Sequence, residues 1–273
     1  MKKLIALLLA ALMVFALVAC GTQPAETTTD PAAETTASDL AYVKEKGTLV
    51  VGITDFAPMD YKNEAGEWIG FDADMAKAFA AKLGVAVEFV EIDWDNKALE
   101  LDSKTIDCVW NGMTLTDEVK AAMDCSKAYC NNAQVVIVPA EVAENYQTAE
   151  ACKDLRFAVE AGSAGEKEVT ALGYATTPVK TQADALLEVS AGTSDAAVID
   201  SLMAAAMVGE GTGYEKLTYT AQLNSEEYGV GFRKGSDLVN EINTFFAEAY
   251  ADGSMMKAAE TYGVQAAVIA QEA

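Results

Sequence analysis

Short β-rich runs alternate with amphipathic helical segments along this chain, and this alternation limits the possible folds more than any other feature. In the first half, residues 46–54, 85–93 and 105–112 predict strands, and residues 71–84 and 95–103 predict helices. Strands that are separated by helices pair in parallel, because each crossover helix returns the chain to the same end of the sheet. The first half therefore predicts βαβ units around a parallel sheet.

The same alternation returns in the second half of the chain. Residues 155–162 and 194–200 predict strands, and residues 164–173, 182–192 and 201–209 predict helices. Two similar α/β lobes explain this return better than one long sheet.

The last part of the chain has helices but no sheet of its own. Residues 226–235 predict a strand and a turn, and residues 240–263 predict two amphipathic helices that meet at Asp252-Gly253. We expect this tail to pack back on the first lobe. The chain would then cross between lobes near residues 133–139 and again near residues 228–232.

These crossings define the expected domains. The first lobe comprises residues 40–134 and 230–273, and the second comprises residues 135–229.

The N-terminal segment predicts export. Lys2 and Lys3 precede one apolar block, which is typical of a secretory signal peptide over residues 1–19. The block ends in LVACG, which resembles a bacterial lipobox with lipidation of Cys20; an ordinary signal or a single anchor helix is the alternative. Residues 20–39 hold Thr, Ala, Pro and acids, which predicts a disordered tether. We expect a protein that is lipid-anchored to the outer face of the bacterial cell membrane.

Composition argues against several kinds of partner. The chain has 19 Lys+Arg and 42 Asp+Glu, a formal net charge of −23, and such a surface repels nucleic acid. The chain has no histidine, and the spacing of its cysteines fits no zinc motif. We therefore expect no metal. We also expect no cofactor and a monomeric protein. Cys108, Cys125, Cys130 and Cys152 could be free thiols or could form one disulfide.

Ligands of open α/β sheets bind beyond the carboxyl ends of the strands, where helix N-termini present free N–H groups. Five strand ends carry suitable polar or aromatic residues: TDFAPM at 54–59, DW at 93–94, NGMT at 111–114, EAGSAGE at 160–166, and Asp200.

Six segments resemble, in order and spacing, the family 3 extracellular solute-binding proteins. They are GITDFAPMDYKNEAGEWIGFDADMAKAFAAKLG, EFVEIDWDNKALEL, IDCVWNGMTLTDE, FAVEAGSAGE, SDAAVID and EEYGVGFRKG. The resemblance covers nearly all of residues 42–263. It implies a periplasmic-binding-protein-like α/β fold, with two lobes joined by two hinge strands that close over a ligand. It also implies an ABC permease and its ATPase as partners.

The resemblance carries binding roles onto five residues of the first lobe. Phe56 matches the aromatic position that stacks on the ligand, and Trp94 matches the opposing wall; ordinary core packing is the alternative for each. Asn111, Gly112 and Thr114 match a turn that contacts the ligand. Thr116, nearby, is expected to cap the following helix.

In the second lobe, Gly162, Ser163 and Ala164 match a loop that holds an anion through backbone amides. Asp200 matches the acid that binds the ligand's α-ammonium group, with helix capping as the alternative.

The sequence departs from the family pattern at the carboxylate clamp. The arginine that clamps an amino acid's α-carboxylate is replaced by Val119, the acid of the first turn by Ile53, and a lysine sometimes found in lobe two by Glu160. We therefore expect either an amino acid held without the arginine or a cationic ligand that needs no carboxylate clamp. An enzyme that reuses the fold is a weaker reading, because the sequence offers no assembled nucleophile–base pair.

Overall fold

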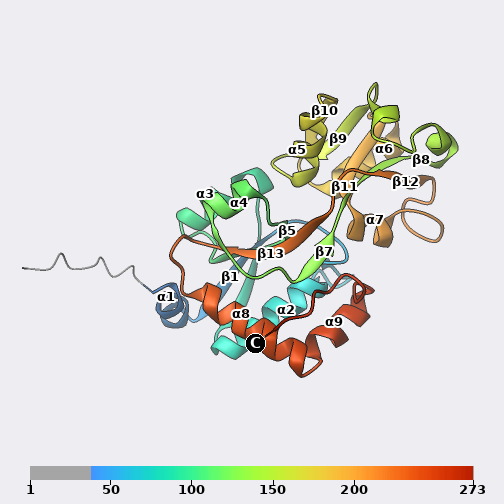
Figure 1. Ribbon diagram of the computed structural model, residues 1–273. Coiled ribbons are helices and arrows are strands. Elements are labelled where there is room, and N and C mark those ends of the chain that lie inside the picture. The colour runs from blue at the N-terminus through green and yellow to red at the C-terminus, as the bar shows by residue number, and fades with distance from the viewer. Residues whose placement is uncertain (1–37, 273) are drawn as a thin grey trace, which may run out of the picture. The chain divides into compact units, whose positions relative to one another are not determined.

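A computed structural model describes residues 38–272, which belong to one compact unit built on two main β-sheets (Figure 1). The first main sheet has the strand order β4-β1-β5-β13-β6, and β7 also pairs with β13. The second has the order β10-β9-β11-β8-β12. Each sheet mixes parallel pairs with antiparallel ones, and the prediction of two α/β lobes is confirmed.

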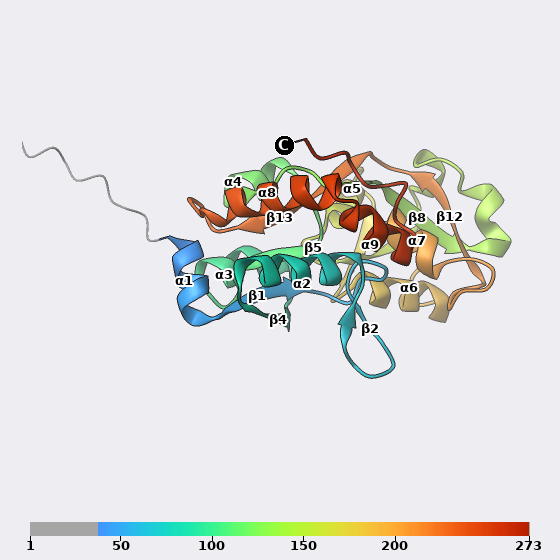
Figure 2. The same cartoon turned by 90° about the horizontal axis from the view of Figure 1, so that it is seen from below.

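The first lobe is formed by segments from both ends of the described chain. Its strands are β1 (Thr48–Ile53), β4 (Ala86–Glu91), β5 (Cys108–Thr114), β6 (Asp124–Cys125), β7 (Cys130–Asn132) and β13 (Glu226–Phe232), with a hairpin of β2 (Tyr61–Lys62) and β3 (Trp68–Ile69). Its helices are α1 (Asp39–Lys46), α2 (Phe71–Leu83), the 3₁₀ turn η1 (Trp94–Asn96), α3 (Lys97–Asp102), α4 (Asp117–Ala122), α8 (Leu238–Ala251) and α9 (Ser254–Tyr262). Helix α2 packs against α8 and α9 and against β1 and β5, while the β2–β3 hairpin projects from the lobe (Figure 2).

The second lobe is continuous in sequence. Its strands are β8 (Gln134–Pro139), β9 (Arg156–Glu160), β10 (Ala175–Val179), β11 (Ala196–Asp200) and β12 (Leu217–Gln222). Its helices are α5 (Ala164–Ala171), α6 (Gln182–Ala191) and α7 (Ser201–Met207), with 3₁₀ turns η2 (Ala140–Asn145) and η3 (Glu150–Cys152).

Strand β11 is apolar on both faces because both faces are buried. Side chains alternate between the two faces of a strand, and helices cover both faces of this sheet. Ala197 and Ile199 join the core cluster that includes α6 and α7, whereas Ala196 and Val198 join the one that includes α5. A strand buried on both faces therefore reads as a continuous apolar run, as AAVI does here.

Several expected boundaries differ from those of the structure. All of β13 lies in the first sheet, so the second crossing falls between β12 and β13 rather than near residues 228–232. Asp39, expected in the tether, is the first residue of α1 and is buried against Arg233. Strands β10 and β12 were not predicted, because their sequences ATTPV and LTYTAQ are polar and only partly buried.

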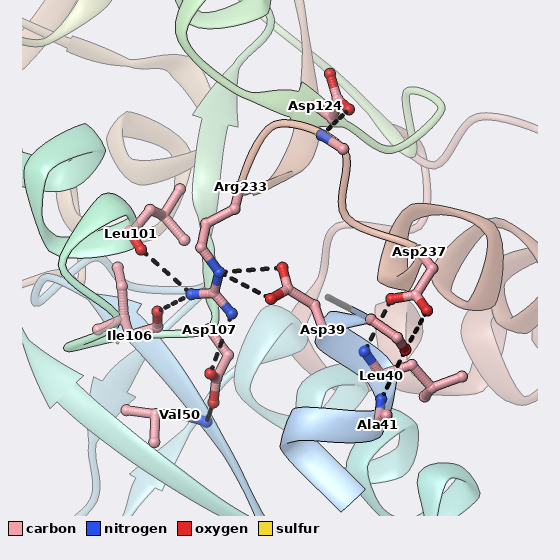
Figure 3. Close-up of polar contacts among 12 residues, drawn as sticks. Asp39, Leu40, Ala41, Val50, Leu101, Ile106, Asp107, Asp124, Arg233 and Asp237 are labelled. Atoms are coloured by element: carbon pink, nitrogen blue, oxygen red, sulfur yellow. Dashed lines mark hydrogen bonds and ion pairs between the residues drawn. The ribbon is translucent and has the colours of Figure 1, made fainter. Parts of the chain in front are cut away.

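Arg233 is a structural ion-pair centre in the first lobe (Figure 3). Its Nε donates to both carboxylate oxygens of Asp39 at 3.1 and 3.0 Å, and its terminal nitrogens donate to the Ile106 carbonyl at 2.7 Å and to Asp107 at 3.4 Å. Asp107 in turn accepts from the Val50 N–H at 2.8 Å. The guanidinium group thus joins α1, β1, β13 and the chain before β5, and it takes no part in the pocket described below.

Within residues 38–272, no helix is long and apolar enough to span a membrane. Cys108, Cys125, Cys130 and Cys152 are all free thiols, so of the two alternatives the structure shows the one without a disulfide. The expected signal peptide, Cys20 and nearly all of the expected tether lie outside the described residues.

Candidate functional site

A narrow pocket lies between the two lobes, at the carboxyl ends of β1, β5, β9 and β11. Its lining residues are Thr54, Phe56, Trp94, Lys97, Asn111, Gly112, Met113, Thr114, Thr116, Val119, Gln134, Glu160, Gly162, Ser163, Ala164, Lys167, Gln182 and Asp200. All nine residues that the sequence analysis selected for ligand binding are in this set. The cavity volume is about 30 Å³, room for roughly two water molecules, so a larger ligand requires the lobes or the side chains to move.

Phe56 and Trp94 form the aromatic part of the lining from the first lobe. Phe56 follows β1 and makes an edge-to-face contact with Tyr228, with ring centroids 6.3 Å apart. Trp94 begins η1, and the Lys97 ammonium nitrogen lies 4.8 Å from its ring centroid. Both aromatic side chains are more than nine-tenths buried, yet each has a surface on the pocket.

Asn111 lines the pocket, but its side chain is fully engaged within the first lobe. Its Oδ1 accepts from the N–H of Thr54 at 3.0 Å and from the Thr54 hydroxyl at 2.8 Å. Its Nδ2 donates to the Thr54 carbonyl and to Asp60. Asn111 therefore fixes the end of β1 against β5, which makes it a residue that positions the pocket wall.

The prediction of a turn at Asn111–Thr114 is wrong, because this segment is the last part of β5. Gly112 has φ +54°, in the left-handed region, and a Cβ there would lie 2.4 Å from Phe56 Cε1. Its N–H donates to Asp72 at 2.7 Å. Glycine is thus required for the close approach of Phe56, and the strand continues through the irregularity because β13 pairs with it.

Thr114 and Val119 line the pocket with different groups, a hydroxyl and an apolar side chain. The Thr114 hydroxyl donates to Glu226 Oε1 at 2.9 Å, so it is already engaged with a residue of β13. Val119 is 7% exposed and presents an apolar side chain to the pocket. Its N–H donates to the Thr116 hydroxyl at 3.1 Å, which confirms Thr116 as the cap of α4.

The loop before α5 brings the second lobe into direct contact with the first. Gly162 has φ +72°, and a Cβ there would lie 2.7 Å from the Asp95 Cα. Its carbonyl accepts from the Lys97 ammonium at 3.1 Å. Ser163 caps α5 by accepting from the Glu166 N–H at 3.1 Å. The N–H groups of Ala164 and Gly165, in the first turn, have no partner within the helix.

Asp200 is the centre of a buried polar network where the lobes meet. Its Oδ1 accepts from Gln134 Nε2 and from the Tyr228 hydroxyl, both at 2.8 Å, and also from the Asn132 amide. Its Oδ2 accepts from the Gln182 amide. Asp200 occupies the N-cap position of α7 but makes no capping hydrogen bond, so helix capping does not explain its carboxylate.

Burial is the largest cause of the unusual pKa values of the pocket acids. It raises the pKa of Asp200 to about 8, together with the charge of Glu226, against the opposing effect of the donors from Gln182 and Tyr228. Burial also raises the pKa of Glu160 to about 8, with the charge of Asp200 as the second cause. Lys97 is affected in the other direction, because burial lowers its pKa to about 8.

The curated relatives and solved structures agree with this architecture. The family model described as Bacterial extracellular solute-binding proteins, family 3, matches residues 49–265. The arginine-binding extracellular protein ArtP of Bacillus subtilis (strain 168) is 29% identical, over 94% of this chain and 96% of its own. The L-cystine-binding protein TcyJ of Escherichia coli (strain K12) is 30% identical, over 82% and 85%. A mutant of ArgBP from T. maritima superimposes with a TM-score of 0.78 at 32% identity, over 82% of this chain and 99% of its own.

Four residues of the site and its surroundings were not identified from the sequence: Gln134, Gln182, Glu226 and Lys97. The first three hold Asp200 or Thr114 through side-chain amides and a carboxylate, and they come from three different elements. Single Gln and Glu residues near the ends of strands and helices are common, so a single sequence does not distinguish these three. Lys97 alone could have been noticed, because it is a lysine three residues after Trp94, at the start of α3.

Two further carboxylates, Asp60 and Asp72, are buried in the first lobe, where they accept hydrogen bonds from the pocket residues Asn111 and Gly112. Asp72 accepts from the Gly112 N–H at 2.7 Å and from the Tyr129 hydroxyl at 2.6 Å, and its Oδ1 has no partner. Burial raises the pKa of Asp72 to about 7. Burial and the charge of Asp72 raise the pKa of Asp60 well above its usual range.

This pair predicts a pH dependence of stability. An unfolded aspartate has a pKa of about 3.9, so between pH 4 and pH 7 folded Asp72 binds a proton that the unfolded chain does not bind. The free energy of unfolding should therefore rise by roughly 1.5 kcal/mol as the pH falls from 7 to 5.5. Asp72→Asn should remove this part of the slope and be more stable than the wild type at pH 8, because its oxygen can still accept from Gly112 and Tyr129. Urea unfolding at several pH values measures this.

Asp102→Asn is the matched control, because it removes the same charge from an exposed helix end. It should keep the wild-type slope. A D72N variant with the wild-type slope, or one less stable than the wild type at pH 8, would contradict the assignment of this slope to Asp72.

Proposed function

The chain belongs to the bacterial extracellular solute-binding proteins of family 3, and from that premise we propose that it captures an amino acid outside the cell and delivers it to an ABC permease. The observation that carries this proposal is the pocket between the lobes, which is lined by the acids Glu160 and Asp200 and by Ala164 in the first turn of α5. A zwitterion needs both kinds of group. Relatives whose names state arginine, cystine and histidine as ligands support the amino acid class.

The proposed ligand roles follow the charges of the lining. Asp200 and its network form the acidic end, which suits an α-ammonium group. The N–H groups of Ala164 and Gly165 at the start of α5 suit a carboxylate, because a helix N-terminus carries partial positive charge. Phe56 and Trp94 supply the walls, and Gly112 and Gly162 allow the close approach of both sides.

Because position 119 is a valine, helix α4 offers no guanidinium partner to the carboxylate of the ligand. The cations that line the pocket are Lys97 and Lys167, and Lys167 forms an ion pair with Glu118 across the lobes. Lys97 is mostly buried, and its ammonium donates to the carbonyls of Trp94 and Gly162 at 3.0 and 3.1 Å. We propose that the amides of α5, assisted by the charge of Lys97, replace the missing arginine.

Closure of the lobes is the proposed means of capture. The lobes expected from the sequence meet again at Gly162 and Asp95, at Lys167 and Glu118, and at Lys180 and Asp93, whose charged atoms are 3.7 Å apart. These contacts join the lobes at residues outside the crossings β7–β8 and β12–β13, so a rotation about the crossings would separate them. Opening would admit a ligand that the narrow cavity cannot.

A cationic ligand without a carboxylate is the second candidate, and the observation that favours it is the replacement of the clamp by Val119. Such a ligand would use Asp200 and the aromatic walls but not the N–H groups of α5. The transport role would be the same.

A ligand screen distinguishes the two candidates. The exported chain from residue 21, unfolded and refolded to remove bound ligand, would be heated with each standard amino acid and with amines that lack a carboxylate. A ligand at 1,000 times its Kd stabilises the fold by about 4 kcal/mol, which shifts the melting temperature clearly. We expect stabilisation by an amino acid and none by the corresponding decarboxylated amine. Stabilisation by amines alone would overturn the amino acid proposal in favour of the second candidate.

We also propose that the exported protein is anchored by a lipid on Cys20 at the outer face of the membrane, beside its permease and ATPase. The segment LVACG supports this proposal. In the producing bacterium, the wild type should fractionate with membranes and a Cys20→Ala variant should not. A variant that remains membrane-bound would contradict lipidation at this residue.

A further inference from the structure

Glu160 is a buried acid of the pocket that none of the roles above uses. It is the last residue of β9, its side chain is 3% exposed, and it lines the pocket together with Asp200. The neighbouring strand β11 runs parallel to β9 and ends at Asp200, so both carboxylates stand at the same edge of the sheet.

The two acids differ in how many hydrogen bonds their carboxylate oxygens accept. Asp200 accepts from four side-chain donors, of which three bond to its Oδ1. Glu160 Oε1 is buried and has no hydrogen-bond partner among the described residues. A buried oxygen without a partner is costly, and the cost is largest for a charged group. Of these two acids, Glu160 is thus the one with clear unused capacity to accept.

The neighbouring lysine does not supply the missing partner. The charge of Lys97 is close enough to lower the pKa of Glu160, against the larger effect of burial. However, the Lys97 ammonium donates to the carbonyls of Trp94 and Gly162, and no ion pair joins it to Glu160. Glu160 Oε1 is therefore free to accept a hydrogen bond from a donor that the ligand brings.

We infer that Glu160 binds a second cationic group of the ligand, at the end of its side chain, and that the solute is a basic amino acid. This inference rests on the proposed function, because it assigns the α-ammonium group to Asp200 and leaves the second cation for Glu160. A ligand with one ammonium group would leave Glu160 Oε1 unpaired. A guanidinium or ammonium terminus removes that cost, and the faces of Phe56 and Trp94 suit the side chain of such a ligand.

Arginine and citrulline form the sharpest pair of probes, because they have nearly the same shape and differ in the charge of the side-chain terminus. Titration calorimetry of the refolded wild type should show arginine bound about 10- to 100-fold more tightly than citrulline, the range expected of one charge-assisted hydrogen bond. Glu160→Gln should weaken arginine binding by a similar factor and leave citrulline binding within about threefold. The preference should therefore nearly vanish in the variant.

Glu88→Gln is the matched control, since it removes one negative charge from an exposed position on β4 that is not part of the pocket lining. It should keep the wild-type preference, which separates a local contact from the effect of net charge. Equal binding of arginine and citrulline by the wild type would overturn the inference even if E160Q did not fold. An equal loss of both ligands in E160Q would also overturn it.

The same titrations separate this inference from the proposed function. If the wild type binds a neutral amino acid and shows no preference for a cationic side chain, the role of Glu160 is wrong and amino acid capture stands. If the wild type binds no amino acid, the proposed function fails and this inference fails with it.

Discussion

The buried carboxylate of Asp200 is the interaction on which the rest of this structure depends. Its donors come from the first crossing between the sheets, from β13 beyond the second crossing, and from α6 of the second lobe: Asn132, Gln134, Tyr228 and Gln182. The oxygens of a buried carboxyl group must be hydrogen-bonded, so the two crossings and the second lobe are held in one arrangement around Asp200. The floor of the pocket is therefore also the place where the lobes are joined, and a ligand that interacts with Asp200 acts directly on the region about which the lobes would rotate.

The lobes contribute different chemistry to the pocket. The first lobe supplies the aromatic and apolar walls together with the charge of Lys97, and Gly112 allows Phe56 to lie close to β5. The second supplies Glu160, Asp200 and the first turn of α5. Neither set can enclose a charged solute alone, because desolvation of the charges needs the walls and recognition needs the polar groups. This division suits a protein whose task is to bind and release, as family membership establishes, and not to perform a reaction.

The sequence predicted the fold class and half of the pocket lining because both depend on local patterns. Strand ends, the glycine in NGMT and the loop EAGSAGE are short signals, and the structure places them together at one cleft. The remaining features depend on tertiary contacts. NGMT continues as strand because β13 pairs with it, and Gln134, Gln182 and Glu226 gain their roles only where distant segments meet. The unpaired oxygen of Glu160 is likewise a property of its surroundings, which no spacing in the sequence reveals.

The most direct test of this account is a crystal structure of the refolded protein with a basic amino acid bound. We predict the α-ammonium group at Asp200, the carboxylate at the first turn of α5, and the side-chain cation within hydrogen-bond distance of Glu160 Oε1. A ligand bound outside the cleft, or one whose carboxylate faces Asp200, would contradict the account.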